Sequence, residues 1–152
     1  MEFFKGLVAN KILLAAVFAW VSAQVLKTII YMIVNKDFKA ERLLGDGGMP
    51  SSHSATVCAL ATASAYEYGS ASFEFAVTAI LAIIVMHDAM GVRRETGRQA
   101  KAINNMMEWI STVQRDITPE ERLKEFVGHS PMQVFFGALL GILVGAICST
   151  VL

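Results

Sequence analysis

The feature that most constrains this chain is an apolar run over residues 12–34, interrupted only by Ser22, Gln24, Lys27 and Thr28. At a rise of about 1.5 Å per residue, a helix of this length crosses a hydrocarbon layer of roughly 30 Å. Hydrophobic residues make up 55% of the 152 residues, and the mean hydropathy of +0.51 is high for a soluble domain. The run is also longer than the apolar part of a signal peptide, so we expect a retained first helix of an integral membrane protein.

Three further segments have the length and composition of helices. Residues 51–68 are rich in alanine, serine and threonine, which favours burial among other helices over exposure to lipid. Residues 73–90 contain the strongly apolar run FAVTAILAIIVM, and residues 131–152 form a fourth apolar segment. We expect one all-α domain over residues 1–152, a membrane bundle of about four transmembrane helices.

The fourth segment has a glycine at every fourth position, at Gly137, Gly141 and Gly145. Residues four apart lie on one helix face, where missing side chains let another helix backbone approach closely. We expect this face to serve close helix packing. Four short helices with such a face also leave room for a homodimer.

A polar insert, about residues 95–127, separates the third segment from the fourth. Apolar residues fall at helical spacing in it beside Trp109, at Ile103, Met106, Met107, Ile110 and Val113. The pattern predicts an amphipathic helix in the membrane interface or, alternatively, a soluble helix that caps the bundle. A capping pattern at residues 118–121 then predicts a second short helix, which Gly128 ends.

The direction of the helices predicts which of their ends meet. If all four segments cross, the C-terminal ends of the first and third meet the N-terminal ends of the second and fourth. This end collects all three histidines and most of the polar residues near helix termini: Lys27, Ser51, Ser52, His53, His87, Asp88, Arg93, Arg94 and His129. We therefore expect a functional site at this end of the bundle.

The sequence GGMPSSHS, residues 47–54, stands directly before the second helix. Pro50 suits the start of a helix, and Ser51 or Ser52 can cap its first turn. The N–H groups and the positive dipole end of such a helix form a ready site for an anion, with His53 in the first turn. The plainer interpretation is a capped helix with an interfacial histidine.

The sequence GHSPMQ, residues 128–133, opens the fourth helix. Ser130 and Gln133 are spaced as a capping box, which explains part of the motif by helix initiation alone. Helix initiation does not explain His129. An imidazole at that position can act as a base, an acid or a nucleophile.

Cationic residues surround these motifs. Arg93 and Arg94 follow the third helix and either set the membrane topology or bind an anion, whereas Lys27 lies inside a span, where a charge normally has a functional partner.

The formal net charge is zero, so composition points to no nucleic-acid partner. Cys58 and Cys148 lie in apolar stretches and lack the spacing of a zinc site or a disulfide framework.

In their order along the chain, these motifs resemble those of the type 2 phosphatidic acid phosphatase superfamily. The order is a lysine late in one helix, PSSH opening the next, arginine after the third, and GHSPMQVFFGALLG opening the last. The GGMPSSHS and DAMGVRR segments resemble most its small, divergent bacterial and plastid branch. The likeness covers about residues 24–145.

The resemblance implies a phosphatase that works through a phosphohistidine, without a metal or another cofactor. It makes His129 the nucleophile and His53 the general acid, and it assigns the phosphate oxygens to Lys27, Ser51, Ser52 and Arg93 or Arg94. Chemistry supports these roles independently, because phosphoryl transfer needs cations and helix N-terminal amides around the phosphate oxygens. A histidine pair can also divide the nucleophile and acid roles.

Three departures from the superfamily pattern concern residues around the predicted phosphate site. Ser52 stands where the usual motif has glycine, and Val34 stands where an arginine-proline pair is usual, so that Arg42 or the second arginine after the third helix takes its place. The long insert separates these arginines from His129. Such a separation is tolerated if the helix ends still converge.

A fourth departure concerns the orientation of the nucleophile. Gln133 stands where the superfamily has a carboxylate that orients the histidine and stabilises its charged form. An amide accepts a hydrogen bond but supplies no charge. Asp88 either replaces that carboxylate or pairs with Arg93 or Arg94 as a structural clamp. We therefore count Gln133 and Asp88 among the candidate catalytic residues.

The sequence thus predicts a multi-pass membrane enzyme that hydrolyses a phosphomonoester or pyrophosphate of a lipid in the cell membrane. The alternative is a non-catalytic protein that binds anionic lipids or assists assembly and retains the phosphate cradle. Eleven of the 13 lysines and arginines lie on the site side, which places that side in the cytoplasm by the positive-inside rule. The expected partners are the bilayer, a lipid phosphate and a second copy of the chain.

Overall fold

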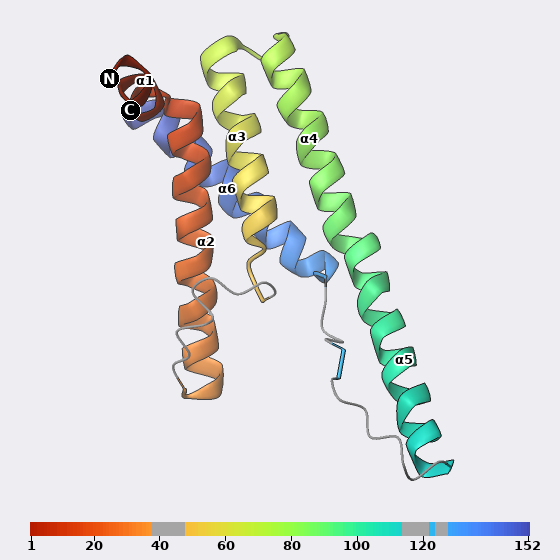
Figure 1. Ribbon diagram of the computed structural model, residues 1–152. Coiled ribbons are helices and arrows are strands. Elements are labelled where there is room, and N and C mark those ends of the chain that lie inside the picture. The colour runs from red at the N-terminus through yellow and green to blue at the C-terminus, as the bar shows by residue number, and fades with distance from the viewer. Residues whose placement is uncertain (38–47, 114–121, 124–127) are drawn as a thin grey trace.

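The computed structural model describes residues 1–37, 48–113, 122–123 and 128–152, and every regular element within them is a helix (Figure 1). The elements are α1 (Glu2–Ala9), α2 (Lys11–Asn35), α3 (Ser52–Tyr68), α4 (Phe73–Met90), α5 (Val92–Val113) and α6 (Pro131–Val151). The predicted all-α membrane fold is confirmed. Arg42 and the short helix expected from residue 118 lie outside the described residues.

Three helical stretches among the described residues are long and apolar enough to cross a membrane. They are α2, the continuous stretch of α4 and α5, and α6. The fourth expected crossing, α3, has 17 residues and a length of about 26 Å, somewhat less than the roughly 30 Å of a hydrocarbon layer. The count of four crossings therefore stays a prediction.

The first helix of the chain was not expected as a separate element. α1 ends at Ala9, and Asn10 interrupts the chain with extended backbone and caps α2. Its side-chain oxygen accepts a hydrogen bond from the Leu13 N–H at 3.0 Å. Asparagine is a strong N-cap because it satisfies one of the unpaired N–H groups of the first turn.

The central helix of the bundle is α3, which packs against α2, α4 and α6. In Figure 1, α2 and α4 flank α3, and α6 crosses behind it, while the two chain ends lie together at the opposite end from the start of α3. The C-terminal end of α2 and the N-terminal ends of α3 and α6 thus lie toward the same end of the bundle, where α4 also ends.

The glycines of α6 pack directly against α3. A Cβ atom at Gly137, Gly141 or Gly145 would approach within 3.0 Å of atoms of Ser51, Ala55 or Ala59, respectively. The expected close helix packing is confirmed. α3 occupies this face within one chain, and the homodimer stays a prediction.

On its other side α3 meets α2 through alanines. Ala19 and Ala23 of α2 form a fully buried cluster with Ala55 and Ala59 of α3. One further turn toward the site end, the same four-residue spacing reaches Lys27 on α2 and Ser51 on α3. The buried core therefore changes from apolar to polar between one turn and the next.

The predicted amphipathic helix is present as α5. It starts at Val92, directly after Gly91, and continues the direction of α4 away from the bundle (Figure 1). Ile103, Met106, Trp109 and Val113 are exposed on it. Its position in a membrane interface stays a prediction.

Candidate active site

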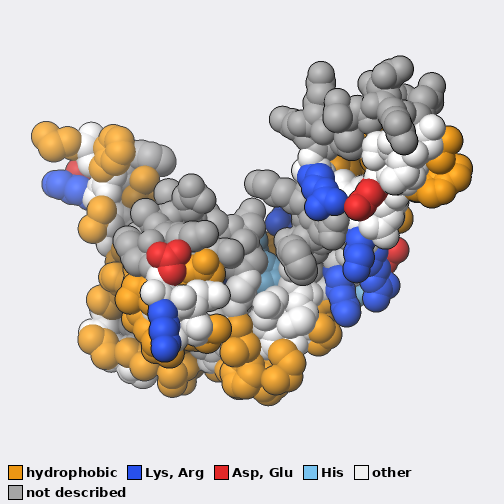
Figure 2. All heavy atoms as spheres, turned by 90° about the horizontal axis from the view of Figure 1, so that it is seen from below, with side chains coloured by type: hydrophobic (Ala, Val, Ile, Leu, Met, Phe, Trp, Pro, Cys, Tyr) orange, Lys and Arg blue, Asp and Glu red, His pale blue; other side chains and the backbone are white. Residues whose placement is uncertain are grey.

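Backbone contacts tie the helix ends of the site together. The Ser51 N–H donates to the Gln133 carbonyl oxygen at 2.9 Å and joins the start of α3 to the first turn of α6. The His129 N–H donates to the Ala89 carbonyl oxygen at 2.9 Å and joins the chain before α6 to the last turn of α4. Figure 2, which looks onto this end, shows histidine side chains near its middle and cationic side chains gathered toward α5.

The two histidines of the predicted mechanism lie side by side. The ring centroids of His53 and His129 are 5.8 Å apart, and the ring planes meet at 80°. His129 is buried, with 3% of its surface exposed, whereas His53 is partly exposed. They come from segments 76 residues apart in the chain, so the fold brings together the two residues to which the resemblance assigns the chemistry.

Gly128 positions His129 against the start of α5. Its φ of +92° lies in the left-handed region, which favours glycine. A Cβ atom there would also approach the backbone of Arg93 and Arg94 within 3.0 Å. The residue before the candidate nucleophile is therefore held both by its own conformation and by a backbone contact.

The N-terminus of α3 carries a cluster of buried hydroxyl groups. Ser51, Ser52 and Ser54 are each at most 4% exposed. The Ser51 hydroxyl caps the helix: it accepts from the Ser54 N–H at 3.4 Å and from the Ser54 hydroxyl at 3.0 Å. Its oxygen is thus used in the cap, and Ser52 and the remaining first-turn N–H groups are better placed to bind an anion.

Lys27 is buried in α2, with 4% of its surface exposed. Gly48 packs on its aliphatic chain, because a Cβ at Gly48 would lie 3.0 Å from the Lys27 Cγ. Gly48 also has a φ of +95° and belongs to the segment that leads into α3. Gly48, just before α3, is therefore packed against the lysine of α2.

The contacts of the described residues favour the structural clamp as the role of Asp88. The Arg93 Nε donates to the Asp88 Oδ2 at 3.0 Å, and both side chains are a little under half exposed. Arg94 is exposed and reaches the site region through its backbone contact with Gly128. Of the two arginines, Arg93 forms an ion pair with Asp88, so a bound phosphate would share the Arg93 guanidinium with Asp88.

Gln133 forms the capping box expected from the sequence. Its Oε1 accepts from the Ser130 N–H at 2.9 Å, and its own N–H donates to the Ser130 hydroxyl at 3.3 Å. The amide oxygen thus takes part in starting α6. The role of Gln133 in orienting His129 stays a prediction.

Two buried polar side chains were missed from the sequence. Gln24 is 7% exposed, and its Oε1 makes no hydrogen bond to any described residue. Asn104, also 7% exposed, accepts from and donates to the backbone of Leu123. Neither residue has a signal in the sequence that marks it as buried.

Within the described part of the chain, no three His, Cys, Asp or Glu side chains are grouped so as to hold a metal ion. The polar groups that converge are imidazoles, hydroxyls, a lysine and helix N–H groups. This donor set suits an anion with several oxygens, such as a phosphate.

Comparison with known proteins gives two matches. The family described as the divergent PAP2 family matches residues 8–144 of this chain. The chain is 42% identical over 149 residues to a protein of Bacillus subtilis (strain 168) called uncharacterized membrane protein YuiD, covering 91% of this chain and 93% of that protein. No solved structure matches the chain.

Proposed function

This chain belongs to the divergent PAP2 family, and from that premise we propose that it is a membrane phosphatase that hydrolyses a phosphomonoester or pyrophosphate of a lipid. The observation that carries the proposal is the pairing of buried His129 with His53, at a ring separation of 5.8 Å. One imidazole serves as nucleophile and the other as proton donor, which is the division of labour that phosphoryl transfer through a phosphohistidine requires.

The reaction proceeds in two displacements. An imidazole nitrogen of His129 attacks phosphorus, the bond from phosphorus to the lipid oxygen breaks, and the His53 imidazolium gives its proton to that oxygen. Water then attacks the phosphohistidine, His53 takes a proton from this water, and the P–N bond breaks to release phosphate. The proton that His53 gives in the first step is thus regained in the second.

Charge on the phosphate oxygens is compensated by groups from three helices. Lys27 supplies a buried cation from α2, the start of α3 supplies N–H groups with Ser52, and Arg93 supplies a second cation after α4. Such preorganised donors stabilise the charge that spreads over the equatorial oxygens in the transition state.

The position of the site at the helix ends of a membrane bundle supports a lipid substrate. Most large apolar side chains of α4 face outward, among them Ile80, Ile83 and Ile84, so the site adjoins a surface suited to lipid. Phosphatidic acid, phosphatidylglycerol phosphate and polyprenyl phosphates all fit this chemistry. We further propose that the protein lies in the cell membrane with the site on the cytoplasmic side, where the positive-inside rule puts it.

A second candidate function rests on Gln133. An amide in place of the orienting carboxylate leaves His129 without that charge, and the Gln133 Oε1 already accepts from the Ser130 N–H. A protein with this change keeps the residues that bind an anion, but its nucleophile is no longer activated. The alternative is therefore a non-catalytic protein that binds anionic lipid headgroups or assists assembly.

Phosphate release by the purified protein in detergent distinguishes the two functions. The substrates are phosphatidic acid, phosphatidylglycerol phosphate and polyprenyl pyrophosphate, each with EDTA present. The variants are His129→Ala and His53→Ala, with His87→Ala as the matched control, because His87 lies exposed in the last turn of α4.

Turnover that survives chelation, disappears in the first two variants and persists in His87→Ala supports the phosphatase. Turnover that persists in His129→Ala contradicts the phosphohistidine mechanism. If no lipid is hydrolysed and wild type still binds vanadate, the binding function is supported instead.

A further inference from the structure

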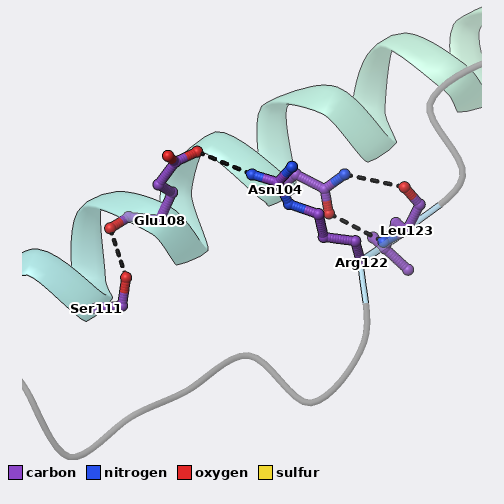
Figure 3. Close-up of polar contacts among 5 residues, drawn as sticks. All are labelled: Asn104, Glu108, Ser111, Arg122 and Leu123. Carbon is purple, nitrogen blue, oxygen red and sulfur yellow. Dashed lines mark hydrogen bonds and ion pairs between the residues drawn. The ribbon is translucent and has the colours of Figure 1, made fainter.

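Asn104 is buried although it lies on α5, which leaves the bundle. It is 7% exposed and shares one face of α5 with the buried residues Gly97 and Ala100. Figure 3 shows what its carboxamide contacts: the Nδ2 donates to the Leu123 carbonyl oxygen at 2.9 Å, and the Oδ1 accepts from the Leu123 N–H at 3.0 Å. One side chain thus satisfies both backbone polar groups of a residue 19 positions away.

Among the described residues, and apart from the exposed Arg122–Glu108 ion pair, the chain is attached to the long helix at two points before it reaches α6. The contact with Leu123 is the first. The second point is formed by Gly128, packed on the backbone of Arg93 and Arg94, and by the hydrogen bond from the His129 N–H to Ala89. Both attachments precede the N-cap of α6 at Ser130. The candidate nucleophile, His129, is part of the second one.

The two attachment points are coupled by covalent geometry. Asn104 and Arg94 are ten residues apart on α5, which corresponds to a rise of about 15 Å. Leu123 and Gly128 are five residues apart, and five residues of chain reach at most about 18 Å. A shift of Leu123 along α5 away from Gly128 by more than a few ångströms is therefore transmitted to Gly128 and His129.

We infer that Asn104 is a positioning residue for His129: by fixing Leu123 on α5, it sets where the chain re-enters the site and holds the His129 ring against His53. The effect of Asn104 on the reaction rate rests on the proposed function, whereas its effect on the position of His129 does not. A displacement of about 1 Å in a reacting group can lower a rate a hundredfold, so a residue far from the chemistry can control it.

A neighbouring contact provides a matched control. Arg122 pairs with Glu108 at 3.2 Å, one residue along the chain and one helical turn along α5 from the Asn104 contact (Figure 3). Both of these side chains are at least 66% exposed, and exposed pairs contribute little to stability. Glu108→Gln removes a contact with the same segment without removing the buried attachment.

The first test measures the accessibility of His129 and needs no enzymatic activity. The full-length protein in detergent is treated with diethyl pyrocarbonate, which acylates accessible neutral imidazoles, and the modified histidines are quantified by mass spectrometry. His129 should react several-fold faster in Asn104→Ala than in wild type, while the exposed His87 reacts at the same rate in both. Glu108→Gln should leave both rates unchanged.

Asn104→Asp guards against a variant that fails to fold. It keeps the acceptor for the Leu123 N–H and loses the donor to the Leu123 carbonyl, so its His129 rate should lie between those of wild type and Asn104→Ala. Equal His129 rates in wild type, Asn104→Asp and any folded Asn104→Ala would overturn the inference. Equal acceleration by Glu108→Gln would also overturn it, because that result means a general loosening of α5.

The second test uses kinetics once a substrate is known. Asn104→Ala should lower kcat by about tenfold to a hundredfold with KM unchanged, and Asn104→Asp should recover part of the loss. A fall in melting temperature with kcat retained overturns the positioning role and leaves the phosphatase proposal intact. If wild type shows no turnover, the phosphatase proposal fails and the accessibility measurement alone decides the inference.

Discussion

The backbone N–H of His129 donates a hydrogen bond to the carbonyl oxygen of Ala89 at 2.9 Å, which fixes the candidate nucleophile to the last turn of α4. Ala89 is itself buried, so the acceptor is held by the bundle. The hydrogen bond uses backbone atoms only, and it therefore places the His129 ring without occupying either ring nitrogen.

Gly128→Ala should abolish activity and lower stability by about 1–3 kcal/mol, because φ is +92° and the new Cβ meets the Arg93–Arg94 backbone. Gly69→Ala is the matched control: its φ is +87°, but a Cβ there has nothing within 4 Å. The control should show the backbone strain without loss of phosphate release. Thermal unfolding and turnover are compared for both, and equal activity in the two variants contradicts the role given to Gly128.

Gly141→Ala should destabilise the bundle by about 1–3 kcal/mol or more, since its Cβ would overlap the backbone of Ala55 and force α6 away from α3. Gly6→Ala, in an open position of α1, should be neutral or stabilise by a few tenths to about 1 kcal/mol through helix propensity. Unfolding followed by tryptophan fluorescence in detergent measures the difference. A neutral Gly141→Ala would mean that the two helices are not in backbone contact.

Gln133→Glu should raise the rate of phosphorylation of His129 by about tenfold or more, because a carboxylate stabilises the charged imidazole. Glutamate also serves as the third residue of a capping box, so the start of α6 is preserved. Gln133→Leu is the paired control, which loses the cap and should cost about 1 kcal/mol of stability without any gain in rate. A Gln133→Glu protein with unchanged turnover would argue that the superfamily carboxylate has no counterpart here.

Asp88→Asn should leave the melting temperature nearly unchanged, because its partner Arg93 is 44% exposed and such pairs are worth about 0–1 kcal/mol. If Asp88 acts only as a clamp for Arg93, kcat is retained. Only KM then changes, because Arg93 is no longer held by the Asp88 carboxylate. A large loss of kcat at constant KM would instead identify Asp88 as the carboxylate that orients His129. Steady-state kinetics with a soluble short-chain lipid phosphate separates the two.

Gln24→Leu should raise stability by about 1–2 kcal/mol, because it replaces a buried amide oxygen that has no hydrogen-bond partner among the described residues. Gln99→Leu, at an exposed position of α5, should change it by less than about 0.5 kcal/mol. The comparison uses melting temperatures of the two variants. A Gln24→Leu protein that is less stable than wild type would mean that the amide is satisfied by a group that the contacts above do not include.

The helices of the bundle were predictable because apolar runs and N-caps are local signals. Residues 73–90 coincide with α4, and the capping box of Ser130 and Gln133 is present as expected. The order of the helices was also enough to predict which ends meet, and so to bring His53 and His129 together. α1 was missed because a single residue, Asn10, separates it from α2.

The remaining features depend on contacts between distant residues and leave no periodic signal. Nothing in the sequence around Asn104 distinguishes it from the exposed Asn105 beside it, yet only Asn104 is buried against Leu123. The choice of Arg93 over Arg94 as the partner of Asp88 depends on where the helix restarts after Gly91. The start of α5 was not predicted because the apolar spacing that indicates the helix begins only at Ile103, whereas the helix itself begins at Val92.

The alanine and glycine contacts of α3 fix the positions of the candidate site residues along the axis of the bundle. Lys27 lies four residues after Ala23 and Ser51 lies four residues before Ala55, and Gly137 meets Ser51 as Gly141 meets Ala55. Sliding one helix by a single turn would move its polar group by about 5.4 Å, which exceeds the length of any hydrogen bond to a phosphate oxygen. The depth of the cradle is thus set by side chains that carry no chemistry of their own.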